Sequence, residues 1–313
     1  MKTAILGTDL SAPSDRIIEN SIEFKLFGIE KIILVFVLNL RSIEDFGDYN
    51  LESAQVKIDL QKDHLVGLGF QAETRIVMGV PANEIMRQVK INHAGLVIIG
   101  SRGNTWTKST LGETASEVLH NMKCPVLMMA FDNKPAEKQQ KELKKEDLRH
   151  FEKYLQKFRK QQPIIEIKQK KINQHVLLTT DFSDFSGNAF QWLKNQLAPL
   201  PMLTLMHIQD IVKISKHLED KLEEFNRIDS ARLEQLKEEF ARVHPETEIR
   251  IVLEYGIPKQ LIPLYIKDNQ VTMTVMGSQG RGFISEFFLG SVSLWVARQT
   301  ESNLLIVPFK QKP

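Results

Sequence analysis

The sequence predicts an α/β fold in two tandem domains, each an open parallel sheet of five strands flanked by helices. Short apolar runs alternate with stretches of helical period, which is typical of βαβ units and a parallel sheet. The same order of segments then occurs a second time along the 313 residues. That length corresponds to about two domains of ordinary size.

Five segments of the first half recur in the second half in the same order. The segment "AILGTDLS" (4–11) matches "VLLTTDFS" (176–183), which aligns Asp9 with Asp181. The other matched pairs are 34–40 with 205–211, 79–85 with 256–262, 98–103 with 275–280, and 124–130 with 302–308. Five ordered matches indicate a duplicated domain rather than chance similarity.

The apolar runs give the expected strands of each half. In the first half these strands surround 3–7, 32–38, 71–78, 95–100 and 125–130. In the second half they surround 175–180, 203–208, 248–254, 271–276 and 303–308. Helices are expected between them. Their apolar residues recur four apart on one face, as at Ile18, Ile22 and Leu26 and again at Ala189, Leu193 and Leu197.

The predicted domains are 1–131 and 174–313, joined by a basic linker over 132–173. The linker holds 13 Lys and Arg against 7 Asp and Glu, a net charge of +6. Apolar residues at helical spacing (Leu148, Phe151, Leu155, Phe158) predict that part of it is an amphipathic helix. One interpretation is a connecting helix packed on a domain. The other is a basic docking surface for a protein partner, nucleic acid or membrane.

Composition narrows the class of protein. The net charge of +2 does not indicate a general polyanion binder, and no nucleic-acid-binding motif is present, so we expect no nucleic-acid partner. The single cysteine excludes an intrachain disulfide and a multi-cysteine metal site. No apolar run reaches the length of a membrane span, and the segment "MKTAILGTDLS" resembles a first strand rather than a signal peptide. A cytoplasmic protein is expected.

The stretch "GSQGRGFISEFFLGS" (277–291) lies between an expected strand and an expected helix. Backbone N–H groups and a helix N-terminus can hold a polyphosphate, and glycine lets the backbone approach the oxygens closely. Arg281 could add positive charge. The loop lacks the Walker A pattern and is not G-x-G-x-x-G after a first strand. An ordinary strand-to-helix turn is the alternative interpretation.

The spacing G-x2-G-x9-G-[ST] at 277, 280, 290 and 291 is more specific. With it, the sequence resembles the universal stress protein family in its tandem two-domain form, over nearly all of both halves but not the linker. The resemblance implies a Rossmann-like sheet in strand order 3-2-1-4-5. It also implies ATP bound by this motif in one branch of the family, whereas another branch lacks both motif and ATP.

The resemblance also implies a set of nucleotide-binding residues in the second half. Thr180 and Asp181 would lie at the ribose and adenine end, Ile208 would line the adenine pocket, and Met276 would lie against the nucleotide. The remaining residues, near the phosphates, are Gly277, Gly280, Arg281, Gly290, Ser291, Val292 and Ser293. One departure is Thr179, where ATP-binding members can carry proline.

The corresponding first-half site is degenerate. Its aligned residues are Asp9, Val37, Gly100, Gly103, Gly112 and Glu113. Only eight residues separate Gly103 from Gly112, and Glu113 replaces the motif serine. Repulsion between this carboxylate and a phosphate charge about 4–5 Å away would weaken phosphate binding by on the order of a few kcal/mol before screening by salt. The prediction is therefore one ATP, with Mg²⁺, in the second domain only.

The predicted function is an ATP-binding stress-response regulator or signalling protein without efficient turnover. The alternatives are a nucleotide-independent interaction scaffold and a slow ATPase or adenylyl-transferring enzyme. No catalytic or metal-ligating residues are assigned. Cys124 and His207 are expected in the packed interior, His207 with hydrogen-bond partners.

The fifth strands (124–130 and 302–308) are expected at sheet edges, where an exposed apolar strand is a pairing hazard. The resemblance implies that such domains pair through this strand. The two halves of one chain are thus expected to pack together, Val126–Met129 against Leu304–Val307. A homodimer and an unknown protein partner are further expectations.

Overall fold

The computed structural model describes residues 3–39, 51–101, 111–130, 171–197, 200–210, 221–280 and 289–309. The two halves of the chain, Met1–Phe131 and Ile172–Pro313, belong to one compact unit. The predicted amphipathic helix of the linker lies outside the described residues. In the part of the chain that is described, no helix is long and apolar enough to cross a membrane.

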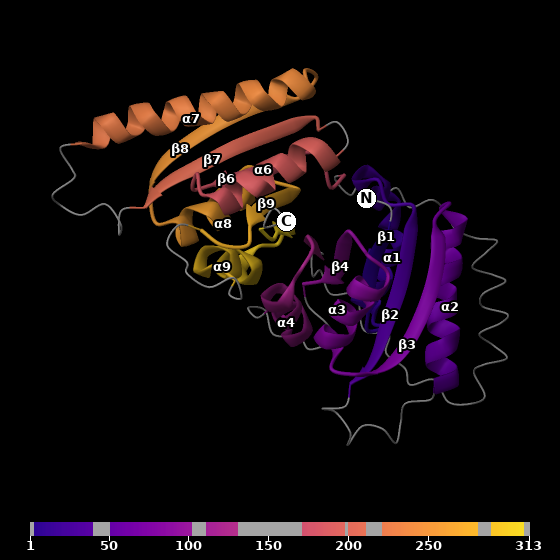
Figure 1. Ribbon diagram of the computed structural model, residues 1–313. Coiled ribbons are helices and arrows are strands. Elements are labelled where there is room, and N and C mark those ends of the chain that lie inside the picture. The colour runs from indigo at the N-terminus through magenta and orange to yellow at the C-terminus, as the bar shows by residue number, and fades with distance from the viewer. Residues whose placement is uncertain are drawn as a thin grey trace. The chain divides into compact units, whose positions relative to one another are not determined.

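The first half alternates strands with helices from β1 onward (Figure 1). Its elements are β1 (Thr3–Thr8), α1 (Ala12–Glu19), the 3₁₀ helix η1 (Ser21–Phe27), β2 (Lys31–Asn39), α2 (Leu51–Gly67), β3 (Gln71–Gly79), α3 (Pro81–Ile91), β4 (Leu96–Gly100), α4 (Glu113–Asn121) and β5 (Val126–Met129).

The second half repeats this order. Its elements are β6 (Val176–Thr180), α6 (Asp184–Gln196), β7 (Met202–Asp210), α7 (Leu222–Val243), β8 (Glu248–Gly256), α8 (Pro258–Asp268), β9 (Met273–Gly277), α9 (Ser291–Gln299) and β10 (Asn303–Val307). The residues before α1 and α6 are N-cap serines whose side chains accept a backbone hydrogen bond, Ser11 from Ser14 and Ser183 from Ser186.

The sheet order is β3-β2-β1-β4-β5-β10-β9-β6-β7-β8. Within each half the strands pair in parallel in the order 3-2-1-4-5, so the predicted fold class is confirmed. At the centre of the sheet order, β5 pairs with β10 antiparallel, with Ile306 opposite Val126 and Leu304 opposite Met128.

Apolar side chains on both faces of the sheet are covered by helices. One face carries α1, η1, α2, α6 and α7, whose buried residues include Phe24, Ile58, Phe190 and Phe240. The other face carries α3, α4, α8 and α9, with Ile85, Val118, Ile262 and Val296 among the buried residues. Cys124 is buried in this second cluster, as expected.

The expected helical face of Ile18, Ile22 and Leu26 is wrong in part. The α-helix ends at Glu19, and the chain continues as the 3₁₀ helix η1. A 3₁₀ helix presents every third residue to one side, so Ser21, Phe24 and Phe27 face the core while Ile22 is exposed. In the second half, Ala189, Leu193 and Leu197 are all buried as predicted.

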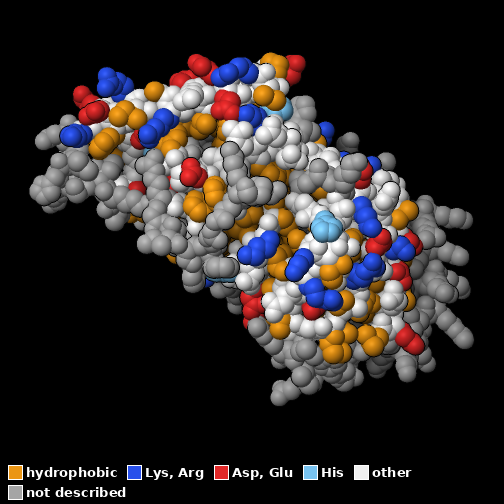
Figure 2. Space-filling model, viewed as in Figure 1, with side chains coloured by type: hydrophobic (Ala, Val, Ile, Leu, Met, Phe, Trp, Pro, Cys, Tyr) orange, Lys and Arg blue, Asp and Glu red, His pale blue; other side chains and the backbone are white. Residues whose placement is uncertain are grey.

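The helix α7 is amphipathic and lies along β8 (Figure 1). Basic and acidic side chains intermingle on its exposed surface (Figure 2), and the exposed Lys237 pairs with Glu234. Few of its residues are fully buried: Leu233 and Phe240 insert into the core. The first turns of α7, by contrast, lie beside a cavity.

Candidate functional site

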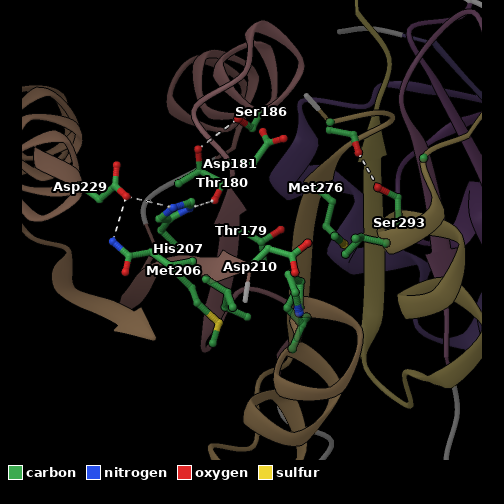
Figure 3. A pocket seen from close by; sticks show the side chains of 18 of the residues that line it. Thr179, Thr180, Asp181, Ser186, Met206, His207, Asp210, Asp229, Met276 and Ser293 are labelled. Carbon is green, nitrogen blue, oxygen red and sulfur yellow. Dashed lines mark hydrogen bonds and ion pairs between the residues drawn. The ribbon is translucent and has the colours of Figure 1, made fainter. Parts of the chain in front are cut away.

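A cavity of about 500 Å³ opens at the carboxyl ends of β6, β7 and β9 (Figure 3). In parallel α/β sheets, ligands bind at this edge, where the strand order reverses. Every nucleotide-binding residue predicted for the second half lines the cavity except Arg281, which lies outside the described residues. These lining residues are Thr180, Asp181, Ile208, Met276, Gly277, Gly280, Gly290, Ser291, Val292 and Ser293.

The turn after β6 presents Asp181 to the cavity. The Asp181 carboxylate accepts hydrogen bonds from the Ser183 backbone N–H at 3.1 Å and from the Ser183 hydroxyl at 2.5 Å. The Thr180 hydroxyl accepts from the Phe182 N–H at 3.0 Å. Phe182 itself has a φ of 57°, in the left-handed region that non-glycine residues seldom adopt. These bonds hold the strained turn and fix the Asp181 carboxylate.

Two glycines allow close approach of the strand and loop at this point. A Cβ at Gly277 would lie 2.8 Å from the Phe185 carbonyl carbon, so the end of β9 passes tightly beside the first turn of α6. A Cβ at Gly280 would lie 2.6 Å from Asp181 Oδ2. The first two glycines of the motif therefore shape the cavity around Asp181.

The N-terminus of α9 forms another wall. Gly290 caps the helix, and its N–H donates to the Ser278 carbonyl oxygen at 2.7 Å. The N–H groups of the first helical turn have no partner within the helix, and the turn has no acidic residue, so it favours an anion. Ser291 is exposed at this end, which leaves its hydroxyl accessible to a ligand.

Ser293 differs from Ser291 in its hydroxyl contacts. The Ser293 side chain is buried, and its hydroxyl donates to the Gly277 carbonyl oxygen at 2.9 Å (Figure 3). That proton is therefore not available to a phosphate oxygen, and only the backbone N–H of Ser293 can serve as the donor. The hydroxyl instead ties α9 to the end of β9.

Sequence reasoning missed the wall formed by α7. Phe225, Ile228, Asp229 and Arg232 all line the cavity, and their spacing places them on one face of the helix. No motif marks these residues in the sequence. The signal that could have found them is an acidic and a basic residue, Asp229 and Arg232, on the helical face that otherwise points to the sheet.

His207 lies between this helix and the turn after β6 (Figure 3). Its Nδ1–H donates to the Thr180 carbonyl oxygen at 2.7 Å, because a carbonyl can only accept. Its Nε2 lies 3.4 Å from Asp229 Oδ2, and its ring packs 4.6 Å from the Phe182 ring centroid. His207 is thus a buried, hydrogen-bonded residue, as the sequence analysis expected.

In the first half, the turn after β1 and the two ends of the loop after β4 correspond to those of the second half. The residue that matches Ser291, however, is not a serine. The Asp9 carboxylate accepts from the Ser11 N–H at 3.1 Å and the Ser14 hydroxyl at 2.5 Å. Gly100 ends β4, and Gly112 caps α4 and donates to the Ser101 carbonyl at 3.1 Å. Glu113 is the first residue of α4, where Ser291 stands in α9.

The two remaining first-half residues complete this comparison. Val37 is partly buried on β2, as the counterpart of Ile208 on β7. Gly103 lies outside the described residues. At the described ends of the first-half loop, Gly100 and Gly112 thus keep the positions of Gly277 and Gly290, while Glu113 stands at the helix N-terminus where the second half has Ser291.

Two halves of strand order 3-2-1-4-5 within one sheet, each with helices on both faces, define a duplicated doubly wound α/β domain. The model of the universal stress protein family matches residues 1–130 and 173–308. The chain belongs to that family, in its tandem form.

Individual relatives agree with this assignment. The chain is 25% identical to universal stress protein MJ0577 of Methanocaldococcus jannaschii in an alignment of 156 residues that covers 42% of this chain and 96% of that protein. It is 27% identical to YxiE of Bacillus subtilis in an alignment of 143 residues that covers 41% of this chain and 97% of that protein. These relatives therefore match a single half.

A solved universal stress protein from Archaeoglobus fulgidus is similar to the whole chain. It has 21% sequence identity and a TM-score of 0.62, with 97% of this chain and 95% of that chain covered. At this identity the likeness shows the fold, including its tandem arrangement.

Proposed function

We propose that the second half binds one ATP per chain and that the protein acts as a nucleotide-responsive regulator in the stress response. The observation that supports it best is the shared cavity: the residues of the G-x2-G-x9-G-S motif and Asp181 line one space of about 500 Å³. That volume is within the range of about 300–1,000 Å³ for small-molecule sites.

The chemistry of the lining fits the three parts of a nucleotide. The first turn of α9 offers N–H groups and the Ser291 hydroxyl to phosphate oxygens. Asp181 can accept hydrogen bonds from sugar hydroxyls. Ile208 and Met276 offer buried apolar surface to the base. Magnesium would enter with the phosphates, whose charge it neutralises when bound.

The arrangement favours binding over turnover. Both ring nitrogens of His207 already face acceptors, the Thr180 carbonyl and the Asp229 carboxylate. A base positioned to activate water would need a nitrogen directed at the ligand. We therefore propose a binding protein whose output depends on the bound nucleotide, acting through a protein partner.

Titration calorimetry with Mg-ATP tests the proposal. We expect one site per intact chain, and nucleotide released on denaturing freshly purified protein would support it. A titration that shows no binding, or two equal sites, would contradict it. Steady release of ADP or AMP by the pure protein would instead favour the enzymatic alternative.

A further inference from the structure

Strand β7 carries two buried polar side chains at positions that are apolar in the first half. His207 pairs with Thr180 in the register of β6 and β7, as Phe36 pairs with Thr8 in the register of β1 and β2. The same registers make Gln209 the counterpart of Leu38, which packs against the core.

A third polar residue, partly buried, faces this pair from the following helix. Asp229 lies four residues before the buried Leu233 of α7, and Ala54 lies four residues before the buried Ile58 of α2. The duplicated domain therefore has the polar set His207, Gln209 and Asp229 in one copy. In the other copy Phe36, Leu38 and Ala54 stand in their place.

The fold does not require the polar set. In the first half, Phe36 and Ala54 are buried in the core, and the turn after β1 forms with the same left-handed geometry. Leu10 has a φ of 58° there and Phe182 a φ of 57° here. Burying polar groups costs free energy that apolar side chains of similar size would not cost. We therefore attribute these three polar residues to a function that the second half has and the first half lacks.

The contacts within the set leave one atom unpaired. Gln209 Nε2 donates to Asp229 Oδ2 at 3.1 Å, and because a carboxylate can only accept, this bond fixes which way the amide is turned. Arg232 Nη1 donates to Asp229 Oδ1 at 3.3 Å, so Arg232 holds one oxygen of this carboxylate and Gln209 the other, with His207 Nε2 3.4 Å from Oδ2. Gln209 Oε1 is buried without a hydrogen-bond partner among the residues that the structure describes.

An unpaired buried acceptor destabilises the folded state, because it has given up its hydrogen bonds to water without replacing them. Gln209 is 4% exposed and lines the cavity, so a ligand that brings a hydrogen-bond donor would remove this cost. A phosphate does not match, because its oxygens accept. Phe225 and Ile228 of α7 line the same cavity as Ile208 and Met276, so they add apolar surface for a flat aromatic ring to the surface already assigned to the base.

We propose that Gln209 determines the base specificity of the second-half site, with Oε1 accepting a hydrogen bond from the exocyclic amino group of a 6-aminopurine nucleotide. Asp229, which accepts a hydrogen bond from Arg232 and lies beside His207, is the positioning residue for the amide. This inference rests on the proposed nucleotide binding and adds to it a reason for preferring adenine over a base with a carbonyl at that position.

The test compares ATP with inosine triphosphate, which carries a carbonyl oxygen in place of the 6-amino group. The parent should bind ATP at least tenfold more tightly in calorimetric titrations. The variant H207F/Q209L/D229A replaces the three polar residues of the second half by the apolar residues found at the corresponding positions of the first half. It should bind the two nucleotides with affinities within about twofold of each other, and its melting temperature should be unchanged or higher.

The single variant Gln209→Leu decides the matter if the triple variant does not fold. A parent that binds both nucleotides equally, or a Gln209→Leu variant that keeps the parental preference for ATP, would overturn the specificity role and leave nucleotide binding intact. A parent that binds neither nucleotide would overturn the proposed function, and the subsite with it. A variant that merely loses stability at an unchanged preference would show that the set is structural.

Discussion

Gly280 and Asp181 occupy adjoining space, such that a Cβ at position 280 would lie 2.6 Å from Asp181 Oδ2. The other carboxylate oxygen, Oδ1, accepts the two hydrogen bonds from Ser183 that begin α6. The glycine therefore leaves Oδ2 room beside the cavity while Oδ1 holds the turn. The second glycine of the motif therefore makes room for the Asp181 carboxylate, in addition to the role proposed for the motif in binding phosphates.

Substituting Gly280 by alanine should displace the Asp181 carboxylate and weaken ATP binding by about tenfold, equivalent to about 1.4 kcal/mol. The obstructing atom is the end of a side chain, so the carboxylate can swing aside and the loss of folding stability should stay below about 1 kcal/mol. Calorimetric titration and thermal melting measure the two effects separately.

Gly187→Ala is the matched control for that substitution. Gly187 lies inside α6, and nothing lies within 4 Å of a Cβ placed there. Alanine should therefore raise stability by about 0.5–1 kcal/mol through helix propensity. ATP affinity should not change. Equal affinities for the Gly280 variant and the parent would show that Asp181 does not contact the ligand.

Exchanging the residues at the two helix N-termini tests the asymmetry between the halves. Ser291→Glu should copy the first-half sequence and lower ATP affinity at least tenfold, about 1.4 kcal/mol, because the carboxylate repels the phosphates. Position 291 is exposed, and an acid in a first helical turn is stabilising by a few tenths of a kcal/mol. The Ser291→Glu variant should therefore keep the melting temperature of the parent while its affinity for ATP falls.

The converse change, Glu113→Ser, is the informative partner experiment. It removes the negative charge from the first turn of α4, where the glycine cap is already in place. A second, weak ATP site per chain would show that Glu113 was the main obstacle. An affinity unaltered by Ser291→Glu would mean that the phosphates lie elsewhere in the cavity.

The internal repeat and the alternation of apolar runs were enough to predict the strands and their parallel pairing, because each strand is marked by residues that must be buried on both faces. The strand order 3-2-1-4-5 was implied by the resemblance to the universal stress protein family. The motif residues were predictable for a related reason: glycine and serine recur at fixed spacing where backbone approaches backbone, as at Gly277 and Gly290. Such features can be predicted because the residues that form them lie close together in the sequence.

The parts that could not be predicted depend on contacts between distant segments. Nothing near Asp229 in the chain indicates that it meets His207 and Gln209 from the preceding strand, since only the packing of α7 on β7 brings them together. The change from α-helix to 3₁₀ helix after Glu19 is equally hidden, because Ile22 keeps the i,i+4 spacing although it is exposed.

The free energy of unfolding should decrease at low pH, because a contact between α6 and α7 depends on the ionised carboxylate of Glu239. Hydrogen bonds from Lys194 and then Gln191 hold the pKa of Glu239 below its ordinary value of 4.5. A lowered pKa in the folded state means that the stabilisation is complete above the unfolded value and is lost as the pH falls through the folded value. Glu239→Gln should cost up to about 1 kcal/mol at pH 7.

The parent and the Glu239→Gln variant should then converge in stability below about pH 4. Urea unfolding at a series of pH values from 7 to about 3 measures this. Glu234→Gln is the control, because Glu234 pairs with Lys237 within α7 and both side chains are more exposed. A constant stability difference between parent and Glu239→Gln across the whole pH range would contradict the assignment.

The last prediction concerns the pairing of β5 with β10, which we propose holds the two halves of the chain together in solution. Ile306 lies opposite Val126 in this antiparallel pair and is fully buried. A charge there would have to be buried without a partner or expelled, so Ile306→Lys should separate or destabilise the halves. We expect a lower melting temperature and faster proteolysis between residues 132 and 171.

Because Ile306 also belongs to the core of its own half, loss of stability alone does not identify the seam. The parent should therefore be cut once in the 132–171 segment and passed over a sizing column. Its two fragments should elute together, whereas those of Ile306→Lys should elute apart. Leu264→Lys, an exposed position on α8, should behave as the parent. Fragments of the parent that separate after a single cut, or scattering from the intact parent that fits two independently moving lobes, would show that this strand pair does not hold the halves together.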